Sequence, residues 1–192
     1  MIFKISEPIC KNNISLCVLS EENVDTLVAI SRDARIWKFG THDFSDETIF
    51  REKWIQKAFC EMENNKRICF VIFLDDKIIG SSSYYHIDTV NKNLSIGYTW
   101  FHPDYWGSSV NPLSKLIMLD YAFETLSMIR VEFCVDSINL PSQNSLAKFG
   151  IQREGVLRNH MILSNNRIRD SVIFSVIPQE WLMIKSNIER FI

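Results

Sequence analysis

The sequence lacks several features that mark specialised classes of protein. Its five cysteines form no Cys-x-x-Cys pair and their number is odd, so they indicate reduced core thiols rather than a disulfide framework. No apolar run approaches the roughly 20 residues that span a bilayer, and the segment from Met1 to Pro8 has no leader-like apolar region. A formal net charge of -2 supplies no field that would gather nucleic acid. We therefore expect a cytoplasmic protein that binds neither membranes nor nucleic acid.

Motifs for several chemistries are missing as well. No His/Cys cluster has metal-ligand spacing, and the sequence contains no Gly-x-Ser-x-Gly elbow, Walker loop or dinucleotide fingerprint. We therefore expect no metal. The 192 residues, 46% of them hydrophobic, suffice for one well-buried core. No repeat, low-complexity tract or linker divides the chain, which predicts a single domain over 1–192.

The hydrophobic periodicity predicts alternating groups of helices and strands. Expected helices run from 20 to about 31, from 45 to about 63, and over 112–126, 139–148 and 180–191. Expected strands cover 68–74, 78–87, 94–101, 130–136, 151–163 and 168–177. The first three strands are joined by short turns and are therefore antiparallel, whereas a helical crossover allows the fourth to run parallel to the third. The prediction is an α/β (α+β) fold with a mixed, mostly antiparallel central sheet flanked by helices.

One stretch runs from a strand through a tight turn directly into a helix, at Trp106-Gly-Ser-Ser-Val-Asn111. Unpaired N–H groups and the dipole at a helix N-terminus favour phosphate binding. We expect Asn111 to be the N-cap and Pro112 the first helical residue. Lys115, one turn later, is either a mobile cation for phosphate or a solvated helix residue. Trp106 either shields the turn or staples it.

Four motifs agree in order and spacing with one known family. They are Ile96-Gly-Tyr-Thr-Trp100, Trp106-Gly-x-x-x-Asn-Pro112, Asn139-x-x-Ser142 leading to Leu146-x-Lys148-x-Gly150, and Glu154-Gly-x-Leu-Arg158. Together they resemble the Gcn5-related N-acetyltransferase (GNAT) superfamily. Within it the chain looks like the Rim-type branch, whose members acetylate α-amino groups of ribosomal proteins and many other amines.

The resemblance implies acetyl-CoA as donor, bound where two strands splay apart and its pyrophosphate meets the turn. Asn139 would contact the pantetheine arm, and Ser142 would donate a proton to the departing thiolate; alternatively, both residues only cap a short helix. Ser109 and Asn111 stand where the family usually has glycine, or glycine and a small residue. The resemblance assigns to the donor site Trp100, Phe101, Trp106, Gly107, Ser108, Ser109, Val110, Asn111, Lys115, Asn139, Ser142 and Lys148.

The general base is less well defined. Ser95 stands where many family members have a glutamate. Glu154 is the catalytic candidate if burial raises its pKa; the alternative is an ion pair with Arg153 or Arg158. Water relayed through Tyr84, Tyr98 or His86 is a further option. The resemblance assigns to the acceptor side Trp37, Phe39, Tyr84 and Tyr98, although aromatic clusters are more often core.

Three hypotheses follow. The leading one is an acetyl-CoA-dependent N-acetyltransferase in which a primary amine attacks the thioester directly, because no cysteine falls in a matched catalytic position. The acceptor is a protein or peptide α-amine or a small-molecule amine. The second is an acyl-CoA-binding or regulatory module with weakened catalysis, suggested by Ser95 and Ser109. The third is a structural protein without affinity for CoA. The resemblance also allows a homodimer, of which the sequence shows no independent signal.

Overall fold

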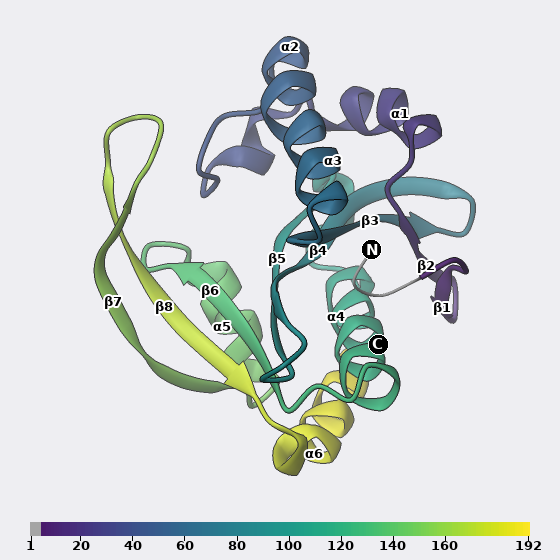
Figure 1. Cartoon of the computed structure of the whole chain (residues 1–192), viewed down its shortest axis with the longest axis vertical. Coiled ribbons are helices and arrows are strands. Elements are labelled where there is room, and N and C mark those ends of the chain that lie inside the picture. The colour runs from purple at the N-terminus through teal and green to yellow at the C-terminus, as the bar shows by residue number, and fades with distance from the viewer. Residues whose placement is uncertain (1–4) are drawn as a thin grey trace.

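A mixed sheet with helices on both faces forms the framework of the computed structural model (Figure 1). The structure describes residues 5–192. Residues 1–4, which are part of the segment expected to lack a leader, lie outside the described residues. The sheet has eight strands in the order β1-β2-β3-β4-β5-β6-β8-β7. They are β1 (Ile9–Lys11), β2 (Ile14–Val18), β3 (Arg67–Leu74), β4 (Lys77–Asp88), β5 (Asn93–Phe101), β6 (Arg130–Asp136), β7 (Gln152–Ile162) and β8 (Ile168–Val176).

Helices connect these strands. They are α1 (Glu21–Ser31), α2 (Glu47–Ile49), α3 (Gln56–Glu63), α4 (Val110–Asp120), α5 (Leu140–Lys148) and α6 (Pro178–Glu189). A π-helical stretch, Phe50–Ile55, joins α2 to α3, and another, Tyr121–Thr125, continues α4. Short 3-10 helices cover Ala34–Trp37 and Pro103–Tyr105. Within residues 5–192, no helix combines the length and the apolar character needed to cross a membrane.

The predicted fold class is confirmed. Each strand expected from the sequence is present, and among the described strands only β5 and β6 pair in parallel, through the expected crossover. The sequence analysis missed β1 and β2. These strands are short, and β2 buries only Ile14 and Leu16 fully while its other residues are partly exposed. Five residues with two buried positions give too weak a period-two signal to be recognised without the neighbouring β3.

The core has two layers, one on each face of the sheet. On β3, Phe70 and Ile72 pack in the cluster that includes α4 and α6, whereas Cys69 and Val71 pack in the cluster that includes α1 and α3. Burial on both faces explains why this strand is apolar from Ile68 to Leu74, after the buried Arg67 at its start. Each such side chain contributes roughly 1.5–3 kcal/mol by leaving water.

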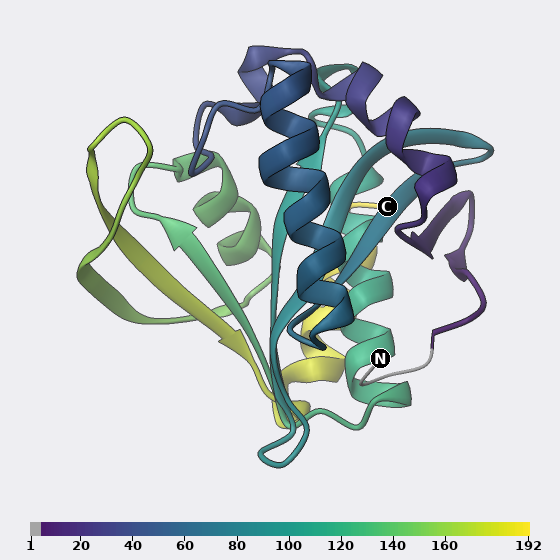
Figure 2. The same ribbon diagram turned by 45° about the horizontal axis from the view of Figure 1, so that its top comes forward.

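The sheet splits between β5 and β6. Their pairing is limited to Asn93–Ser95 with Arg130–Glu132. Beyond these residues the strands diverge, and β6 continues in a second half-sheet with β8 and β7 (Figure 2). The backbone of β5 after Ser95 therefore has no partner strand on this side. The splay implied by the family resemblance is present.

Candidate active site

The turn that begins α4 lies at the end of β5, beside the split. Its N-cap is Ser109, not Asn111 as expected. Ser108 Oγ accepts a hydrogen bond from the Val110 N–H at 3.3 Å, so the helix begins two residues before the expected Pro112. Ser109 has φ -72 and ψ -5, which serine adopts without strain. Only Gly107 in this turn needs positive φ, at +75.

Trp106 fixes this turn to the end of β5. Its indole N–H donates to the Phe101 carbonyl at 3.0 Å, while half of the side chain stays exposed. Trp106 therefore ties the turn to β5, and the exposed part of its ring is free to cover a bound group as well. The Phe101 side chain is part of the core, and the Trp100 ring packs against Trp37 and Trp54. Because both side chains pack in the core, Trp100 and Phe101 present their backbone to the split between β5 and β6.

Lys115 is buried, which corrects the expectation of a solvated or mobile cation. It is 8% exposed, and its Nζ donates to Asn111 Oδ1 at 2.8 Å. Asn111 Nδ2 in turn donates to Ser145 Oγ at 3.2 Å, so the start of α4 is connected to α5. Desolvation lowers the pKa of Lys115 to about 8.

Asn139 and Ser142 lie at the start of α5, directly after β6. Asn139 is the N-cap, and its Oδ1 accepts the Ser142 N–H at 3.2 Å. The capping role considered from the sequence is therefore present, and both residues are only partly buried. Gly150 has φ +80 just after the helix, as expected for a left-handed C′ residue. Lys148, at the far end of α5, is exposed.

Glu154 is held in an ion pair, and the expected rise of its pKa is wrong. Both terminal nitrogens of Arg130 donate to its carboxylate at 2.6 Å, and Ser175 Oγ donates at 2.6 Å. Arg130 foremost, then Ser175, lowers the pKa of Glu154 to about 2. The partner is Arg130 rather than Arg153 or Arg158. A carboxylate with this pKa is a poor base near neutral pH.

Tyr84 is a core residue, which excludes the water-relay and acceptor roles considered for it. It is fully buried, and its hydroxyl donates to the Met118 carbonyl on α4 at 2.5 Å. The neighbouring Tyr85 faces the opposite side of the sheet. The Tyr85 ring lies against Gly97 of β5, because a Cβ added to this glycine would be 2.7 Å from Tyr85 Cε1. Burial raises the pKa of Tyr85, with Cys134 close enough to contribute.

Tyr98 lies at a bulge of β5, on the part of the strand that has left β6. Its φ is +53, and the register with β4 shifts between Ser81 and Ser83. The ring is 40% exposed and lies 3.9 Å from the guanidinium carbon of Arg67. Arg67 is 2% exposed and donates from Nε to Ser83 Oγ at 2.8 Å. A buried guanidinium thus supports an exposed aromatic ring beside the split.

The aromatic loop between α1 and α2 divides its residues between core and surface. Trp37 is buried, donates from its indole N–H to the Ser31 carbonyl at 2.8 Å, and packs against Phe44. Phe39 is partly exposed. In this loop the Thr41 carbonyl accepts the Ser164 N–H at 3.1 Å, which brings the β7–β8 turn against it.

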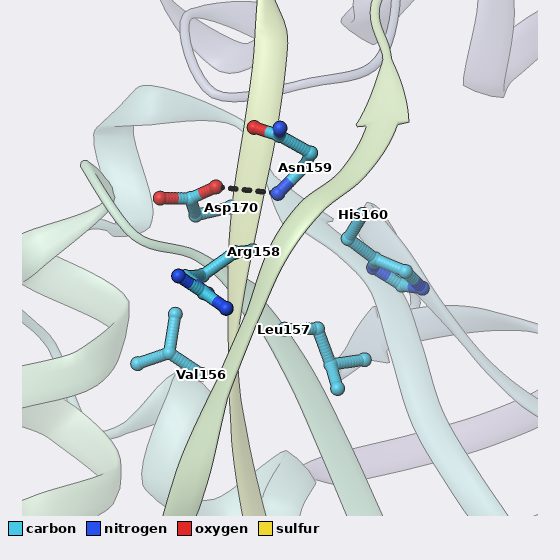
Figure 3. Close-up of a pocket in the computed structure, with 6 residues that line it drawn as sticks. All are labelled: Val156, Leu157, Arg158, Asn159, His160 and Asp170. Atoms are coloured by element: carbon cyan, nitrogen blue, oxygen red, sulfur yellow. Dashed lines mark hydrogen bonds between the residues drawn. The ribbon is translucent and has the colours of Figure 1, made fainter.

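The edge strand β7 has a bulge that sequence analysis did not predict. Asn159 has φ +51, and its N–H donates to Asp170 Oδ1 at 2.7 Å. Because of the bulge, Leu157 and His160 point to the same side of the strand (Figure 3). His160 Nδ1 lies 2.9 Å from Ser171 Oγ and 3.9 Å from Cys134 Sγ. The surface hollow drawn there is lined by Val156, Leu157, Arg158, Asn159, His160 and Asp170.

The cysteines and possible metal ligands complete the description. All five cysteines are free, but only Cys69 is fully buried, so the interpretation of the cysteines as core thiols holds for that residue alone. Cys10 and Cys60 are exposed. Among residues 5–192, no group of three or more His, Cys, Asp or Glu side chains has the arrangement of a metal site.

A split mixed sheet, with one helix starting at the split and another directly after the diverging strand, defines an acyltransferase class of fold. Residues 14–152 match the model of the acetyltransferase (GNAT) domain, so the chain belongs to the GNAT family and is an acetyltransferase enzyme. YdaF of Bacillus subtilis (strain 168), provisionally named a ribosomal N-acetyltransferase, is 26% identical over 178 residues, covering 90% of this chain and 96% of YdaF. That relative agrees with the Rim-type branch.

Solved structures agree with this assignment. A provisionally named acetyltransferase from T. thermophilus has a TM-score of 0.86 and 27% identity, covering 98% of each chain. RimL, the ribosomal L7/L12 alpha-N-protein acetyltransferase crystallised with coenzyme A, has a TM-score of 0.74. It is 19% identical, with 89% of this chain and 98% of RimL covered, and shows that the fold is shared.

Proposed function

We propose that this chain is an acetyl-CoA-dependent N-acetyltransferase that acetylates a primary amine by direct attack in a ternary complex. The observation that carries the proposal is the divergence of β5 and β6 beside the N-terminus of α4. Backbone groups without a strand partner suit the amides of a pantetheine arm, and helix N–H groups suit phosphate. Membership of the GNAT family supports acetyl-CoA as the donor.

The donor's pyrophosphate would bind the amides of the α4 turn, with Trp106 covering it. Its pantetheine arm would follow the unpaired side of β5 past Trp100 and Phe101 and reach Asn139. Ser109 suits this role because its φ of -72 requires no glycine. Residues proposed for donor binding are Trp100, Phe101, Trp106, Gly107, Ser108, Ser109, Val110, Asn111, Asn139, Ser142 and Lys148, and the buried Lys115 would act only through its hydrogen bond to Asn111.

The reaction forms a C–N bond and breaks the C–S bond of the thioester. Ser142 would donate its proton to the departing thiolate and regain one from water. The amine must lose a proton, and Glu154 is not proposed for this step because its pKa is about 2. We assign the proton to water beside the exposed ring of Tyr98. Phe39 and Tyr98 would contact the acceptor, whereas Trp37 is buried and packs against Phe44 and Trp100.

The acceptor class follows from the relative rather than from a pocket. YdaF, named for ribosomal N-acetylation, supports a protein or peptide α-amine over a small amine. A cytoplasmic location accords with five free cysteines. A weakened acyl-CoA-binding module remains the second candidate, because Ser95 and the ion-paired Glu154 leave neither of these positions with a carboxylate poised as base.

Initial-rate kinetics test the proposal. Thiol release would be measured with acetyl-CoA against peptides with free N-termini, spermidine, glucosamine and free amino acids. Intersecting double-reciprocal lines with at least one peptide amine are expected. Binding of acetyl-CoA without turnover on any amine would establish the module instead, and parallel lines would refute direct attack.

A further inference from the structure

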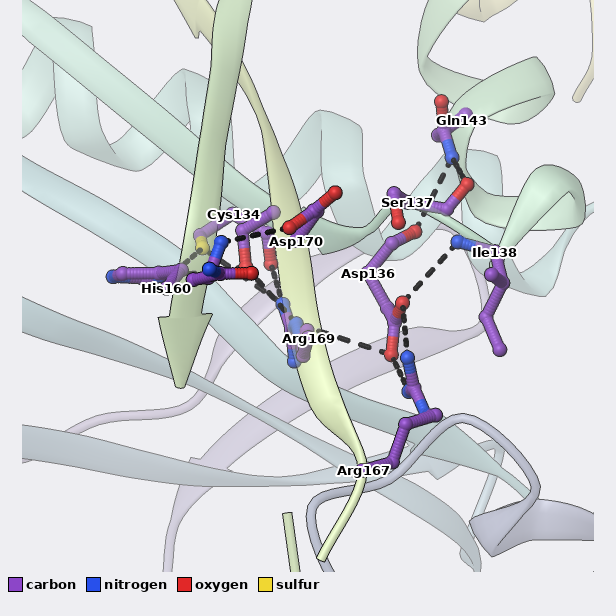
Figure 4. A network of polar contacts seen from close by, with 11 residues as sticks. Cys134, Asp136, Ser137, Ile138, Gln143, His160, Arg167, Arg169 and Asp170 are labelled. Carbon is purple, nitrogen blue, oxygen red and sulfur yellow. Dashed lines mark hydrogen bonds and ion pairs between the residues drawn. The ribbon is translucent and has the colours of Figure 1, made fainter. Parts of the chain in front are cut away.

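A buried carboxylate stands where β6 ends and the loop to α5 begins. The Asp136 side chain is 1% exposed and pairs with two arginines of the β7–β8 hairpin (Figure 4). Both terminal nitrogens of Arg167 contact it, with Nη1 3.4 Å from Oδ1 and Nη2 closer to Oδ2. Arg169 Nε lies 3.9 Å away. The Arg167 side chain is 32% exposed, whereas the carboxylate and Arg169 are buried. Moving both arginines away would leave the buried carboxylate uncompensated, which favours the paired arrangement.

Asp136 also determines the path of the loop that follows it. Its Oδ1 accepts the Ile138 N–H at 3.2 Å. Gln143, in the first turn of α5, donates to the Asp136 carbonyl at 3.2 Å and the Ser137 carbonyl at 2.9 Å. Asn139 follows and caps the helix. The direction of the Asn139 and Ser142 side chains therefore depends on how Asp136 is held.

Arg167 belongs to a turn that touches the other wall of the site. The Leu163 N–H donates to the Arg167 carbonyl at 2.9 Å and closes this turn. The next residue, Ser164, donates to the Thr41 carbonyl in the aromatic loop at 3.1 Å. One short turn thus contacts the acceptor-side loop through its backbone and the α5 loop through the Arg167 side chain.

We propose that Arg167 is a positioning residue that fixes Asn139 and Ser142 through Asp136 and links them to the acceptor-side loop. The inference rests on the proposed function, since it concerns the same site. An acceptor that binds against the aromatic loop between α1 and α2 would hold the β7–β8 turn in place. The turn then keeps Arg167 on Asp136, and Ser142 stays aimed at the sulfur. A misplacement of about 1 Å can lower turnover about 100-fold.

The test compares Arg167→Gln with Arg167→Lys and with Arg153→Gln, an exposed arginine on β7. Arg167 is the residue to change because Arg169 still faces Asp136 after its loss, whereas replacing Asp136 leaves two arginines uncompensated. The first readout is amide hydrogen exchange, which is independent of any reaction. We expect the Ile138 and Ser142 amides to exchange about tenfold faster in Arg167→Gln, with α4 amides unchanged.

Kinetics supply the second readout. In Arg167→Gln, kcat should fall about tenfold and KM for the amine should rise, while affinity for adenosine diphosphate stays within about twofold because α4 is untouched. Arg167→Lys keeps the charge without the planar fork and should recover part of kcat. Unchanged exchange at Ile138 and Ser142 would overturn the positioning role. An inactive wild type that still shows the exchange change would instead refute only the proposed function.

Discussion

Replacing Lys115 with methionine should stabilise the folded protein near neutral pH. The ammonium is 8% exposed, and its hydrogen bond goes to the neutral amide of Asn111 rather than to a carboxylate. Methionine has a similar length and tolerates irregular surroundings. The substitution therefore removes a buried charge while retaining most of the packing.

The magnitude follows from the pKa. Burial lowers the pKa of Lys115 from 10.5 to about 8. At about 1.36 kcal/mol per unit, the charged lysine costs the folded state at most about 3 kcal/mol below pH 8. Loss of the hydrogen bond to Asn111 offsets about 1 kcal/mol. We expect Lys115→Met to gain about 1–2 kcal/mol at pH 7.

The same pKa shift determines how the stability difference between Lys115→Met and wild type changes with pH. Between pH 8 and 10.5 the unfolded chain binds more protons at this residue than the folded chain does, so wild-type stability from this group rises with pH. The advantage of Lys115→Met should therefore shrink across that range. Urea unfolding at pH 7 and pH 10 measures it, with the exposed Lys66→Met as control. A variant less stable than wild type at pH 7, or a difference independent of pH, would refute the reasoning.

Three further predictions concern the site. Ser142→Ala should lower kcat about tenfold or more while the calorimetric Kd for acetyl-CoA stays within about threefold, because a proton donor acts during bond cleavage; unchanged kinetics would remove Ser142 from the mechanism. Glu154→Gln should leave the acidic limb of the pH–rate profile in place, since Glu154 titrates near a pKa of about 2; a displaced limb would restore it as the base. Tyr84→Phe should cost about 1–2 kcal/mol in urea unfolding by removing the bond to Met118, with kcat unchanged; a loss of kcat at equal stability would return Tyr84 to the site.

The fold was predictable because it depends on periodicity and on the order of elements. Strand β3, apolar on both faces, and the helix after the turn at Trp106 carry strong local signals. The site was harder because a strand places neighbours on opposite faces. Which of the adjacent Tyr84 and Tyr85 faces the core depends on how β4 pairs with β5, and no local pattern in the sequence determines that pairing.

Long-range partners were beyond the sequence for a different reason. Glu154 pairs with Arg130, 24 residues away, whereas the nearby Arg153 and Arg158 were the expected partners. The adjacency of β6, β8 and β7 brings these two residues together, and no local pattern encodes it. The hydrogen bond of Lys115 likewise belongs to a long-range connection, because its acceptor Asn111 donates to Ser145 on α5, 34 residues away.

Calorimetric titration with acetyl-CoA tests the central claim most directly. Desulfo-CoA and adenosine diphosphate serve as controls for the thioester sulfur and the pyrophosphate. The account predicts micromolar binding of acetyl-CoA, retained by desulfo-CoA, with a weaker contribution from adenosine diphosphate alone. The absence of detectable binding by all three would contradict a donor site at the split between β5 and β6.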